Sequence, residues 1–470
     1  MSSDSGGQAG APIERKDLLE YFRKPTQSGR LDGCGRCVGV EYELLPVDPA
    51  TGRAVLFAPA DGPGVEAAFL GLLEDPKYQP AEGPLPPTTL QRGRASINLE
   101  PGGQTEVSGS PFRSLGEVEE ELRAILAELA ESARQRGFVY HSHAMQPVSF
   151  SGEIELVPKR RYRIMAEHLA RHGGRRYRDM MTRTASVQAS YDFTGEADAG
   201  RKMRLAMLAA PVAAALFANS PIEAGRESGL MSVRTAIWRE TDEARCGLVP
   251  AALDGEWSWE RYVEHALDVP SILVRAADGG VASAQGRTFR DLLEHGIDGR
   301  RAEMADWELH LSTIFTEARI KRVLEVRSSD APPPGAEMAM PALWAGLFYH
   351  PASLEGGLEL LSPFRAELPE MFHAAARHGL RGRTPGGTQL AGLARDLVAL
   401  ARAGLARLAN PGGQGRPPYS PGLAAVEPGE ERYLAPLEEW VARGRSPAED
   451  ALETFREGGV QALVEKARVR

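Results

Sequence analysis

The stretch from Ser96 to Gly109 is the part of the sequence that most constrains how this chain can fold. Two short alternating segments flank the tripeptide Pro101-Gly102-Gly103, which predicts a turn because proline presets one backbone dihedral angle and glycine accepts positive φ. We therefore expect a β-hairpin whose strands each carry one carboxylate, Glu100 and Glu106. A connection of three or five residues would set these two opposite each other, whereas a two-residue turn would send them to opposite faces of the sheet.

Two further segments, residues 38–44 and 320–327, alternate with the same period of two. In each of them one face of the predicted strand carries charged side chains, which are Glu41 and Glu43 in the first segment and Glu325 and Arg327 in the second. Taken singly, each segment has a simpler interpretation. Glutamates on a hairpin, such as Glu100 and Glu106, are usually solvent-exposed. Glu325 and Arg327 could form a salt bridge on a solvent-exposed strand face.

Taken together, the predicted strands can gather all these glutamates on one face of a sheet. Like charges this close repel each other unless cations neutralise them. A set of oxygen ligands suits Mg²⁺ or Mn²⁺ far better than zinc, and magnesium ions held by carboxylates usually bind phosphates. Arg327 would add positive charge beside a transferring phosphoryl group. The pattern therefore favours phosphoryl-transfer chemistry.

Length and charge exclude several classes of protein. The chain has 470 residues, which fits one large enzyme-type domain or two domains, and its formal net charge of −9 argues against a nucleic-acid partner. The longest apolar run, residues 205–218, contains Pro211 and is too short to span a bilayer, so we expect no membrane partner. The P-loop, dinucleotide-binding, nucleophile-elbow and HExxH motifs are all missing from the sequence.

Cysteine usage fits a reducing compartment, because Cys34, Cys37 and Cys246 are too few for a disulfide framework in so long a chain. We therefore expect a cytoplasmic location. Cys34 and Cys37 have the spacing of a redox motif, but no helical pattern follows them, so we interpret them as an incidental pair of thiols. The polar start predicts a disordered tail over residues 1–15, followed by a single domain over residues 16–470 with a mostly helical C-terminal part.

Capping and periodicity predict several elements around these strands. Ser114 to Glu117 has the form of a capping box at the start of a long helix that ends near Gly137. The other expectations are a central helix over residues 196–218, a β-rich segment over residues 180–193, a polar and aromatic loop over residues 231–238, and a final helix that begins after Ser446.

Beyond these patterns, the sequence resembles the plant and proteobacterial type of glutamate-cysteine ligase, in motifs that run in order from about Lys16 to the C-terminus. The motifs are Gly39-x-Glu41-x-Glu43, residues 99–109, Arg183-Thr184 to Asp192-Phe193, residues 217–221, residues 266–270, Thr288-Phe289-Arg290 and Arg322-x-x-Glu325-x-Arg327. Asn98 and Thr105 depart from the residues of the plant members. The resemblance implies an α+β fold, with a glutamine-synthetase-like curved antiparallel sheet that forms a funnel covered by helices.

The resemblance also implies a reaction and its partners. ATP would phosphorylate the side-chain carboxylate of L-glutamate, and the amino group of L-cysteine would attack the acyl phosphate to give γ-glutamylcysteine, the first step of glutathione biosynthesis. The co-substrate would be ATP with Mg²⁺ or Mn²⁺, and the enzyme would be a monomer or a homodimer. Two rival hypotheses remain open, which are a carboxylate-amine ligase with a different amine or thiol pathway, and a non-catalytic relative that acts as a regulator.

Matching positions assign roles to particular residues. The resemblance makes Arg327 and Glu325 catalytic and gives the metal ligands as Glu41, Glu43, Glu100, Glu106 and Glu325. Arg234 would bind the carboxylate of glutamate, because guanidinium pairs bidentately with carboxylate. A structural ion pair of Arg234 with Asp242 or Glu240 is the alternative. Further candidates for substrate contacts are Gln188, Asn219 and Trp238.

Overall fold

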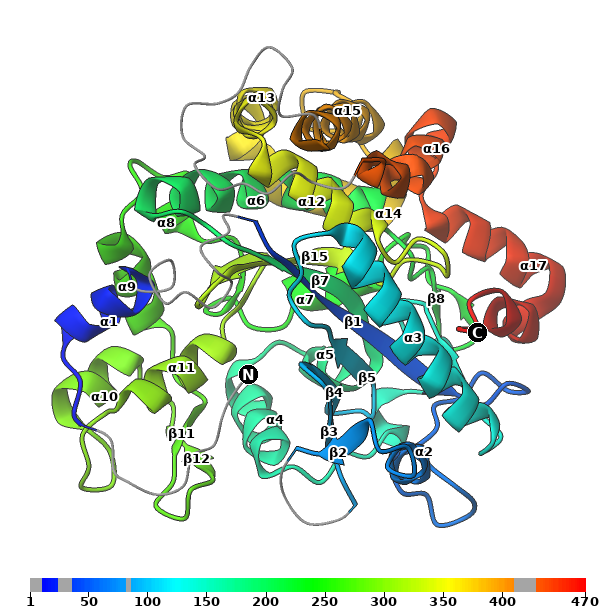
Figure 1. The fold of residues 1–470 in the computed structure, drawn as a ribbon, viewed down its shortest axis with the longest axis horizontal. Coiled ribbons are helices and arrows are strands. Elements are labelled where there is room, and N and C mark those ends of the chain that lie inside the picture. The colour runs from blue at the N-terminus through cyan, green and yellow to red at the C-terminus, as the bar shows by residue number, and fades with distance from the viewer. Residues whose placement is uncertain (1–10, 24–35, 82–85, 410–427) are drawn as a thin grey trace.

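The computed structural model describes residues 11–23, 36–81, 86–409 and 428–470 (Figure 1). Most of the predicted tail over residues 1–15, and Cys34 of the predicted thiol pair, lie outside the described residues. The main strands are β1 (Val38–Val47), β2 (Tyr78–Pro80), β3 (Thr89–Arg92), β4 (Ala95–Leu99), β5 (Thr105–Ser108), β6 (Val139–His141), β7 (Ser186–Tyr191), β14 (Ala318–Ile320) and β15 (Leu324–Asp330).

These strands form one nine-stranded sheet in the order β14-β15-β7-β1-β5-β4-β3-β2, and β6 pairs with β1 beside this path. Every pairing within it is antiparallel. Three short sheets lie outside it and join β8 (Ile222–Glu223) to β9 (Arg226–Glu227), β10 (Cys246–Gly247) to β13 (Phe315–Thr316), and β11 (Leu273–Arg275) to β12 (Val281–Ser283).

Most of the remaining secondary structure in the described chain is α-helical. The helices are α1 (Arg15–Arg23), α2 (Val65–Leu72), α3 (Leu115–Arg134), α4 (Arg160–His172), α5 (Tyr177–Arg183), α6 (Glu196–Leu216), α7 (Val233–Arg239), α8 (Pro250–Leu253), α9 (Trp259–Asp268), α10 (Phe289–His295), α11 (Met304–Ser312), α12 (Ala339–Tyr349), α13 (Pro351–Leu361), α14 (Leu368–His378), α15 (Leu390–Ala409), α16 (Ala435–Arg443) and α17 (Pro447–Lys466). No helix within the described ranges is long and apolar enough to cross a membrane.

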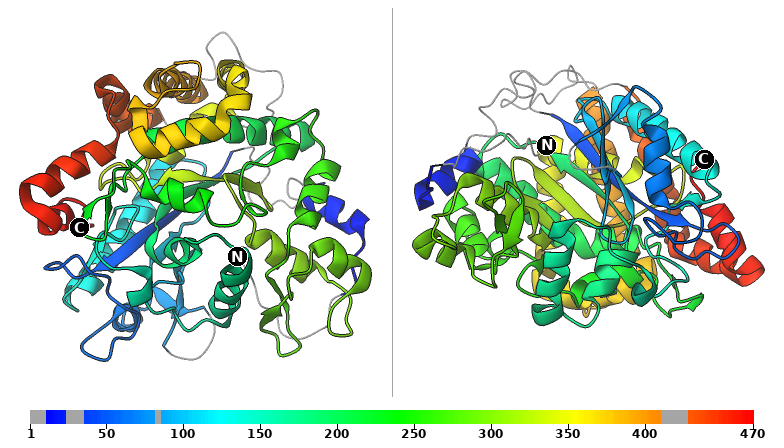
Figure 2. Two further views of the ribbon diagram at one scale, coloured as in Figure 1. Left: turned by 180° about the vertical axis from the view of Figure 1, so that it is seen from behind. Right: turned by 90° about the horizontal axis from the view of Figure 1, so that it is seen from below.

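The alternation of β1 divides the sheet into a covered face and a polar face. Val40, Tyr42 and Leu44 are fully buried, whereas Glu41 and Glu43 between them are only half-buried. Helices cover the apolar side: α12 packs against β7 and β1, α6 packs against β15, and α13 and α15 form a further layer on them (Figures 1 and 2). The polar face therefore remains available for a site.

Local signals explain several of these elements. Ser114 caps α3 by accepting hydrogen bonds from the backbone N–H groups of Gly116 and Glu117, which confirms the predicted capping box. The central helix is also confirmed, since α6 is almost entirely buried and tolerates Pro211 near its C-terminal end. The final helix, α17, begins at Pro447 as predicted, and Gly459 interrupts its course with a positive φ of 65°.

Three local predictions of secondary structure were wrong. The single strand predicted over residues 320–327 is broken by a tight turn, because Ile320 ends β14, the Lys321 N–H donates to the Val323 carbonyl oxygen at 3.0 Å, and β15 begins at Leu324. The β-rich segment begins only at Ser186, because residues 180–183 form the last turn of α5. Residues 233–238, predicted as a loop, belong to α7, whose N-terminus is capped by the Ser232 side chain through the N–H of Thr235. Helices α12 to α17 make up most of the described chain after β15. That residues 16–470 form a single domain stays a prediction.

Candidate active site

Strand register brings the predicted carboxylates to one face of the sheet. Glu43 on β1 lies directly opposite Glu106 on β5, and Glu41 lies between Ser108 on β5 and Gln188 on β7. Further along the sheet, Glu325 on β15 pairs with Ser190, which also pairs with Gly39 of β1. Side chains two residues apart on a strand share a face, and directly paired residues on neighbouring strands lie on the same face. Strands far apart in the sequence therefore contribute to one polar surface.

The β4–β5 hairpin adds Glu100 to this surface. Leu99 pairs with Thr105, so the connection runs over the five residues 100–104 and has the predicted odd length. The Glu100 N–H donates to the Gln104 carbonyl oxygen at 2.8 Å, and the Gly103 N–H donates to the Glu100 carbonyl oxygen at 2.9 Å. The predicted register was wrong by one pair, because Glu106 faces Asn98 and Glu100 lies one pair further along.

The turn of this hairpin is held in place by α5. The Gln104 side chain accepts from the Gly102 N–H at 2.8 Å and donates to the carbonyl oxygens of Met181 and Thr184 at 3.2 and 3.0 Å. Gly102 lies against this helix so closely that a Cβ atom there would be 2.5 Å from the Cα of Thr182. The position of Glu100 and Glu106 therefore depends on contacts outside the sheet.

The clustered carboxylates on β1 and β5 disfavour each other's ionisation. Burial, together with the charges of Glu106 and Glu100, raises the pKa of Glu43 to about 8. Burial also raises the pKa of Glu41 and of Glu106, and nearby carboxylates add to the effect in both cases. Such a cluster gains free energy from a bound cation.

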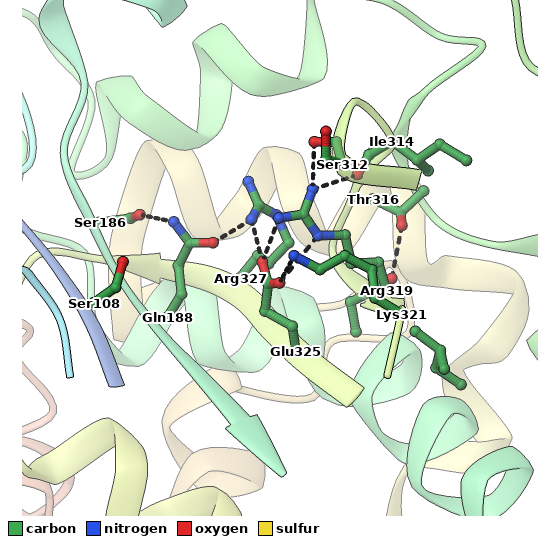
Figure 3. Close-up of polar contacts among 12 residues, drawn as sticks. Ser108, Ser186, Gln188, Ser312, Ile314, Thr316, Arg319, Lys321, Glu325 and Arg327 are labelled. Atoms are coloured by element: carbon green, nitrogen blue, oxygen red, sulfur yellow. Dashed lines mark hydrogen bonds and ion pairs between the residues drawn. The ribbon is translucent and has the colours of Figure 1, made fainter. Parts of the chain in front are cut away.

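Glu325 has the opposite environment (Figure 3). Its side chain is 1% exposed and contacts Arg319 at 2.9 Å, Lys321 at 3.2 Å and Arg327. Burial opposes ionisation, but these three basic groups outweigh it and hold the pKa of Glu325 well below its usual range. Arg319 and Glu325 are direct partners across the β14–β15 pair. The sequence analysis did not predict the contacts of Arg319 and Lys321 with Glu325. A tight turn recognised after Ile320 would have indicated that Arg319 pairs with Glu325.

Gln188 connects the acidic and the basic parts of the polar face. Its amide nitrogen donates to Glu43 Oε1 at 3.1 Å and to Ser186 Oγ at 3.1 Å, while its amide oxygen accepts from Arg327. Ser186 in turn donates to Glu43 Oε2 through its N–H at 2.6 Å and its hydroxyl at 3.0 Å. The side chain of Gln188 is thus committed to protein partners on both sides.

Arg234 and Trp238 of α7 line a pocket next to Arg327. Arg234 donates to the Arg327 carbonyl oxygen at 3.0 Å, lies 3.8 Å from Asp330, and lies over the Trp238 ring with 5.8 Å to its centroid. Its Nε is buried without a partner among the described residues. The alternative ion pair with Asp242 is absent from the described structure, where Asp242 binds Arg245 at 2.6 Å.

Asn219 is not among the residues that line this pocket. Its amide nitrogen donates to the Ala331 carbonyl oxygen at 2.8 Å, and its N–H donates to Asp330 Oδ2 at 2.9 Å. Asp330 is almost completely buried and also accepts from the hydroxyls of Ser220 and Ser232 at 2.7 and 2.9 Å. Asp330, which sequence reasoning missed, thereby links Asn219 to the N-terminus of α7 and to Arg234.

The donor set of the polar face fits a hard cation. No group of three or more histidine, cysteine, aspartate or glutamate side chains in the described ranges is already arranged around a metal position. However, the side chains of Glu41, Glu43 and Glu106 offer oxygen donors only, and burial together with the charges of neighbouring carboxylates raises their pKa values. Carboxylate oxygen donors are the chemistry that Mg²⁺ and Mn²⁺ prefer.

A comparison with solved structures identifies the fold. The structure is similar to the crystal structure of a glutamate-cysteine ligase from Francisella tularensis in complex with AMP, with a TM-score of 0.55 and 12% sequence identity. The likeness covers 92% of this chain and 88% of that chain. It confirms the predicted α+β fold with a large antiparallel sheet and covering helices.

Sequence comparison then gives the family. Residues 37–466 match the model of glutamate-cysteine ligase family 2. Chloroplastic glutamate-cysteine ligases match as well, from Nicotiana tabacum at 36% identity over 95% of this chain and 81% of that protein, and from Arabidopsis thaliana at 32% over 94% and 80%. The chain therefore belongs to this family of ATP-dependent ligases, which form γ-glutamylcysteine in the first step of glutathione synthesis.

The comparison corrects one prediction. A cytoplasmic location was expected from the scarcity of cysteines, and it is contradicted by the finding that these plant relatives are named as chloroplastic enzymes. The physical reason for the error is that few cysteines indicate a reducing environment and do not identify the compartment.

Proposed function

We propose that the polar face of the sheet binds Mg²⁺, or Mn²⁺, together with the phosphates of ATP. Support comes from one observation above all: carboxylates from β1 and β5 face one another, and burial with mutual repulsion raises their pKa values. The ligands would be Glu41, Glu43, Glu100 and Glu106, with Glu325 at the edge of the cluster. A bound divalent cation supplies positive charge that lets the phosphates approach the substrate carboxylate.

Arg327 and Glu325 would act on the phosphates. Arg327 lies between Gln188 and Glu325 and donates to both side chains, so its guanidinium has a fixed direction. A fixed cation beside a transferring phosphoryl group stabilises the charge that develops on its oxygens. Glu325 would hold Arg327 in this position and add a carboxylate oxygen toward the cation.

The pocket formed by Arg234 and Trp238 would bind glutamate. Arg234 is nearly buried, has a nitrogen without a partner in the described chain, and lies beside Arg327. A carboxylate entering the pocket would gain hydrogen bonds to this guanidinium, while methylene groups pack on the indole ring. Gln188 would keep Arg327 and Glu43 aligned, and Asn219 would support Arg234 through Asp330.

The reaction then needs positioning and charge stabilisation from these residues and no covalent enzyme intermediate. A γ-carboxylate oxygen of glutamate attacks the γ-phosphorus of ATP, and ADP leaves. The cysteine amino group attacks the carbonyl carbon of the acyl phosphate, phosphate leaves, and the amine loses a proton. The product is γ-glutamylcysteine, with ADP and phosphate.

Direct measurement of the amine requirement tests this function. Purified enzyme with ATP, Mg²⁺ and glutamate should release ADP steadily only when cysteine is added, and serine, alanine and glycine serve as alternative amines. A faster rate with another amine would contradict the assignment and favour the rival carboxylate-amine ligase. The expected partners are small-molecule substrates, without nucleic acid or membrane, and light scattering should report a monomer or a homodimer.

Cation binding tests the site residues. We expect the Glu43→Gln and Glu106→Gln variants to bind Mn²⁺ at least about 10-fold more weakly than the parent protein, because each removes a charged oxygen donor. Electron paramagnetic resonance of free Mn²⁺ measures this without turnover. The exposed Glu359 of α13 gives the matched control Glu359→Gln, which should bind normally. Unchanged affinity in both site variants would remove the support for a cation at this face.

A further inference from the structure

Glu317 lies in the pocket beside Arg234 and Arg327, and the chemistry described above does not use it. It is the single acidic residue among those that line this pocket. Within the described part of the chain its carboxylate makes no hydrogen bond and no ion pair, although it is close enough to Arg234 to stabilise that cation electrostatically. A half-buried carboxylate of this kind is available to a ligand.

The backbone of Glu317 is held firmly against Arg327. The Glu317 N–H donates to the Gly247 carbonyl oxygen at 2.8 Å, and the Glu317 carbonyl oxygen accepts from the Arg327 N–H at 2.9 Å. This second bond forms where the register of β15 with β7 shifts between Val326 and Ser329. The irregularity therefore places an acidic and a basic residue on the same pocket wall at a fixed separation.

The pocket combines opposite charges with an apolar wall. Arg234 and Arg327 supply two guanidinium groups, Glu317 supplies one carboxylate, and the rings of Trp238 and Phe315 meet edge to face with centroids 5.7 Å apart. A simple dicarboxylate would match the guanidinium groups but leave Glu317 facing negative charge. An α-amino acid matches all three parts, because it carries a carboxylate, an ammonium group and aliphatic carbons.

We propose that Glu317 binds the α-ammonium group of the substrate glutamate while Arg234 binds its α-carboxylate. Glu317 is then the residue that selects an α-amino acid over an unsubstituted dicarboxylate. The inference rests on the proposed binding of glutamate in this pocket. A carboxylate–ammonium contact in a half-buried pocket is a charge-assisted hydrogen bond and discriminates strongly against a ligand that lacks the donor.

The test compares glutamate with glutarate, which differs only in the missing ammonium group. Glu317→Gln keeps the size of the side chain and removes its charge. We expect this variant to lose about 10- to 100-fold in kcat/KM for glutamate, and in glutamate affinity measured by calorimetry without cysteine, while glutarate is used and bound as well as or better than by the parent enzyme. KM for cysteine and for ATP should stay unchanged.

Other outcomes overturn the inference. An equal loss for glutamate and glutarate would mean that Glu317 only balances the two arginines. A selective rise in KM for cysteine would mean that it contacts the attacking amine. Circular dichroism verifies folding of the variant, and Glu317→Asp should recover part of the preference for glutamate. If the parent enzyme binds no glutamate, the proposed function itself fails, whereas normal glutamate use with unchanged discrimination in Glu317→Gln refutes this inference alone.

Discussion

Glu43 and Glu325 carry the same side chain on one face of the sheet, yet their surroundings move their pKa values in opposite directions. Glu43 is flanked by carboxylates and receives hydrogen bonds from the neutral groups of Ser186 and Gln188. Glu325 is surrounded by basic side chains. The identity of the neighbours, and not burial alone, therefore decides which carboxylate needs an added cation.

Arg319 is expected to be essential for stability, because it is almost buried and donates to Glu325 as well as to the carbonyl oxygens of Ser312 and Ile314. Arg319→Gln should lower the free energy of unfolding by about 3 kcal/mol, since it leaves part of a buried charge uncompensated. Urea denaturation measures this. The exposed Arg402, paired with Glu438 at 2.7 Å, gives the control Arg402→Gln, expected to change stability by about 0.5 kcal/mol or less. Equal losses of stability in Arg319→Gln and Arg402→Gln would contradict this prediction.

The site could be predicted from the sequence where one strand decides the geometry. The period of two was enough to place Glu41 and Glu43 on one face, because alternation is a property of the strand alone. Pairing between strands was harder: Glu106 proved to face Asn98 instead of Glu100, and the contact of Arg319 with Glu325 went unnoticed. These contacts depend on register, which the length of each connection sets.

At the scale of elements, the β4–β5 hairpin depends on its contact with α5. Gly102→Ala should destabilise the protein by about 1–3 kcal/mol and weaken Mn²⁺ binding, because the new methyl group would meet the Thr182 backbone at 2.5 Å and push the hairpin away. Thermal unfolding and Mn²⁺ titration measure the two effects.

Gly152 supplies the matched control for this substitution. A Cβ at Gly152 would have nothing within 4 Å, so Gly152→Ala should leave both stability and Mn²⁺ affinity nearly unchanged. If Gly102→Ala behaves in the same way, the contact between the hairpin and α5 does not position the carboxylates.

The wrong prediction for α7 has a local cause. Residues 233–239 contain the β-branched and aromatic side chains Val233, Thr235, Ile237 and Trp238, which disfavour a helix in isolation. The helix forms because Ser232 caps it and because Asp330 of β15 accepts a hydrogen bond from the Ser232 hydroxyl at 2.9 Å. A long-range partner therefore overrode local propensity, and the sequence near Ser232 did not reveal it.

For the whole molecule, buried neutral histidines should set the limit of acid stability. Burial lowers the pKa of His143 to about 4, and of His141 and His310 to about 3, from an ordinary value of 6.5. The folded state thus binds fewer protons than the unfolded state below pH 6.5. The histidine contribution to stability is complete above that pH and falls by about 1.4 kcal/mol per histidine for each pH unit between 6.5 and roughly 4. The raised pKa values of Glu41, Glu43 and Glu106 act in the opposite direction above their ordinary pKa of 4.5, so the histidine contribution dominates only below that pH.

Urea denaturation at a series of pH values checks this prediction. His143→Gln should reduce the slope of stability against pH in the acid range by about the contribution of one histidine. The exposed His295 gives the control His295→Gln, which should keep the slope of the parent protein. An unchanged slope in His143→Gln would show that the acid sensitivity arises elsewhere.

The order of the strands in the sheet has a consequence for synthesis of the chain. The ribosome has added the glutamates of β1 and β5 once it reaches Ser108. Strands β14 and β15, which complete the sheet beside β7, follow more than two hundred residues later. At about 5–20 residues per second, roughly 10–40 s separate the two events. In the later part of that time, once β7 has been synthesised, its edge awaits its partner, and an unpaired edge can recruit a strand from another chain. A nascent chain released early, before Arg319, would therefore expose an acidic, incomplete sheet that is prone to aggregation.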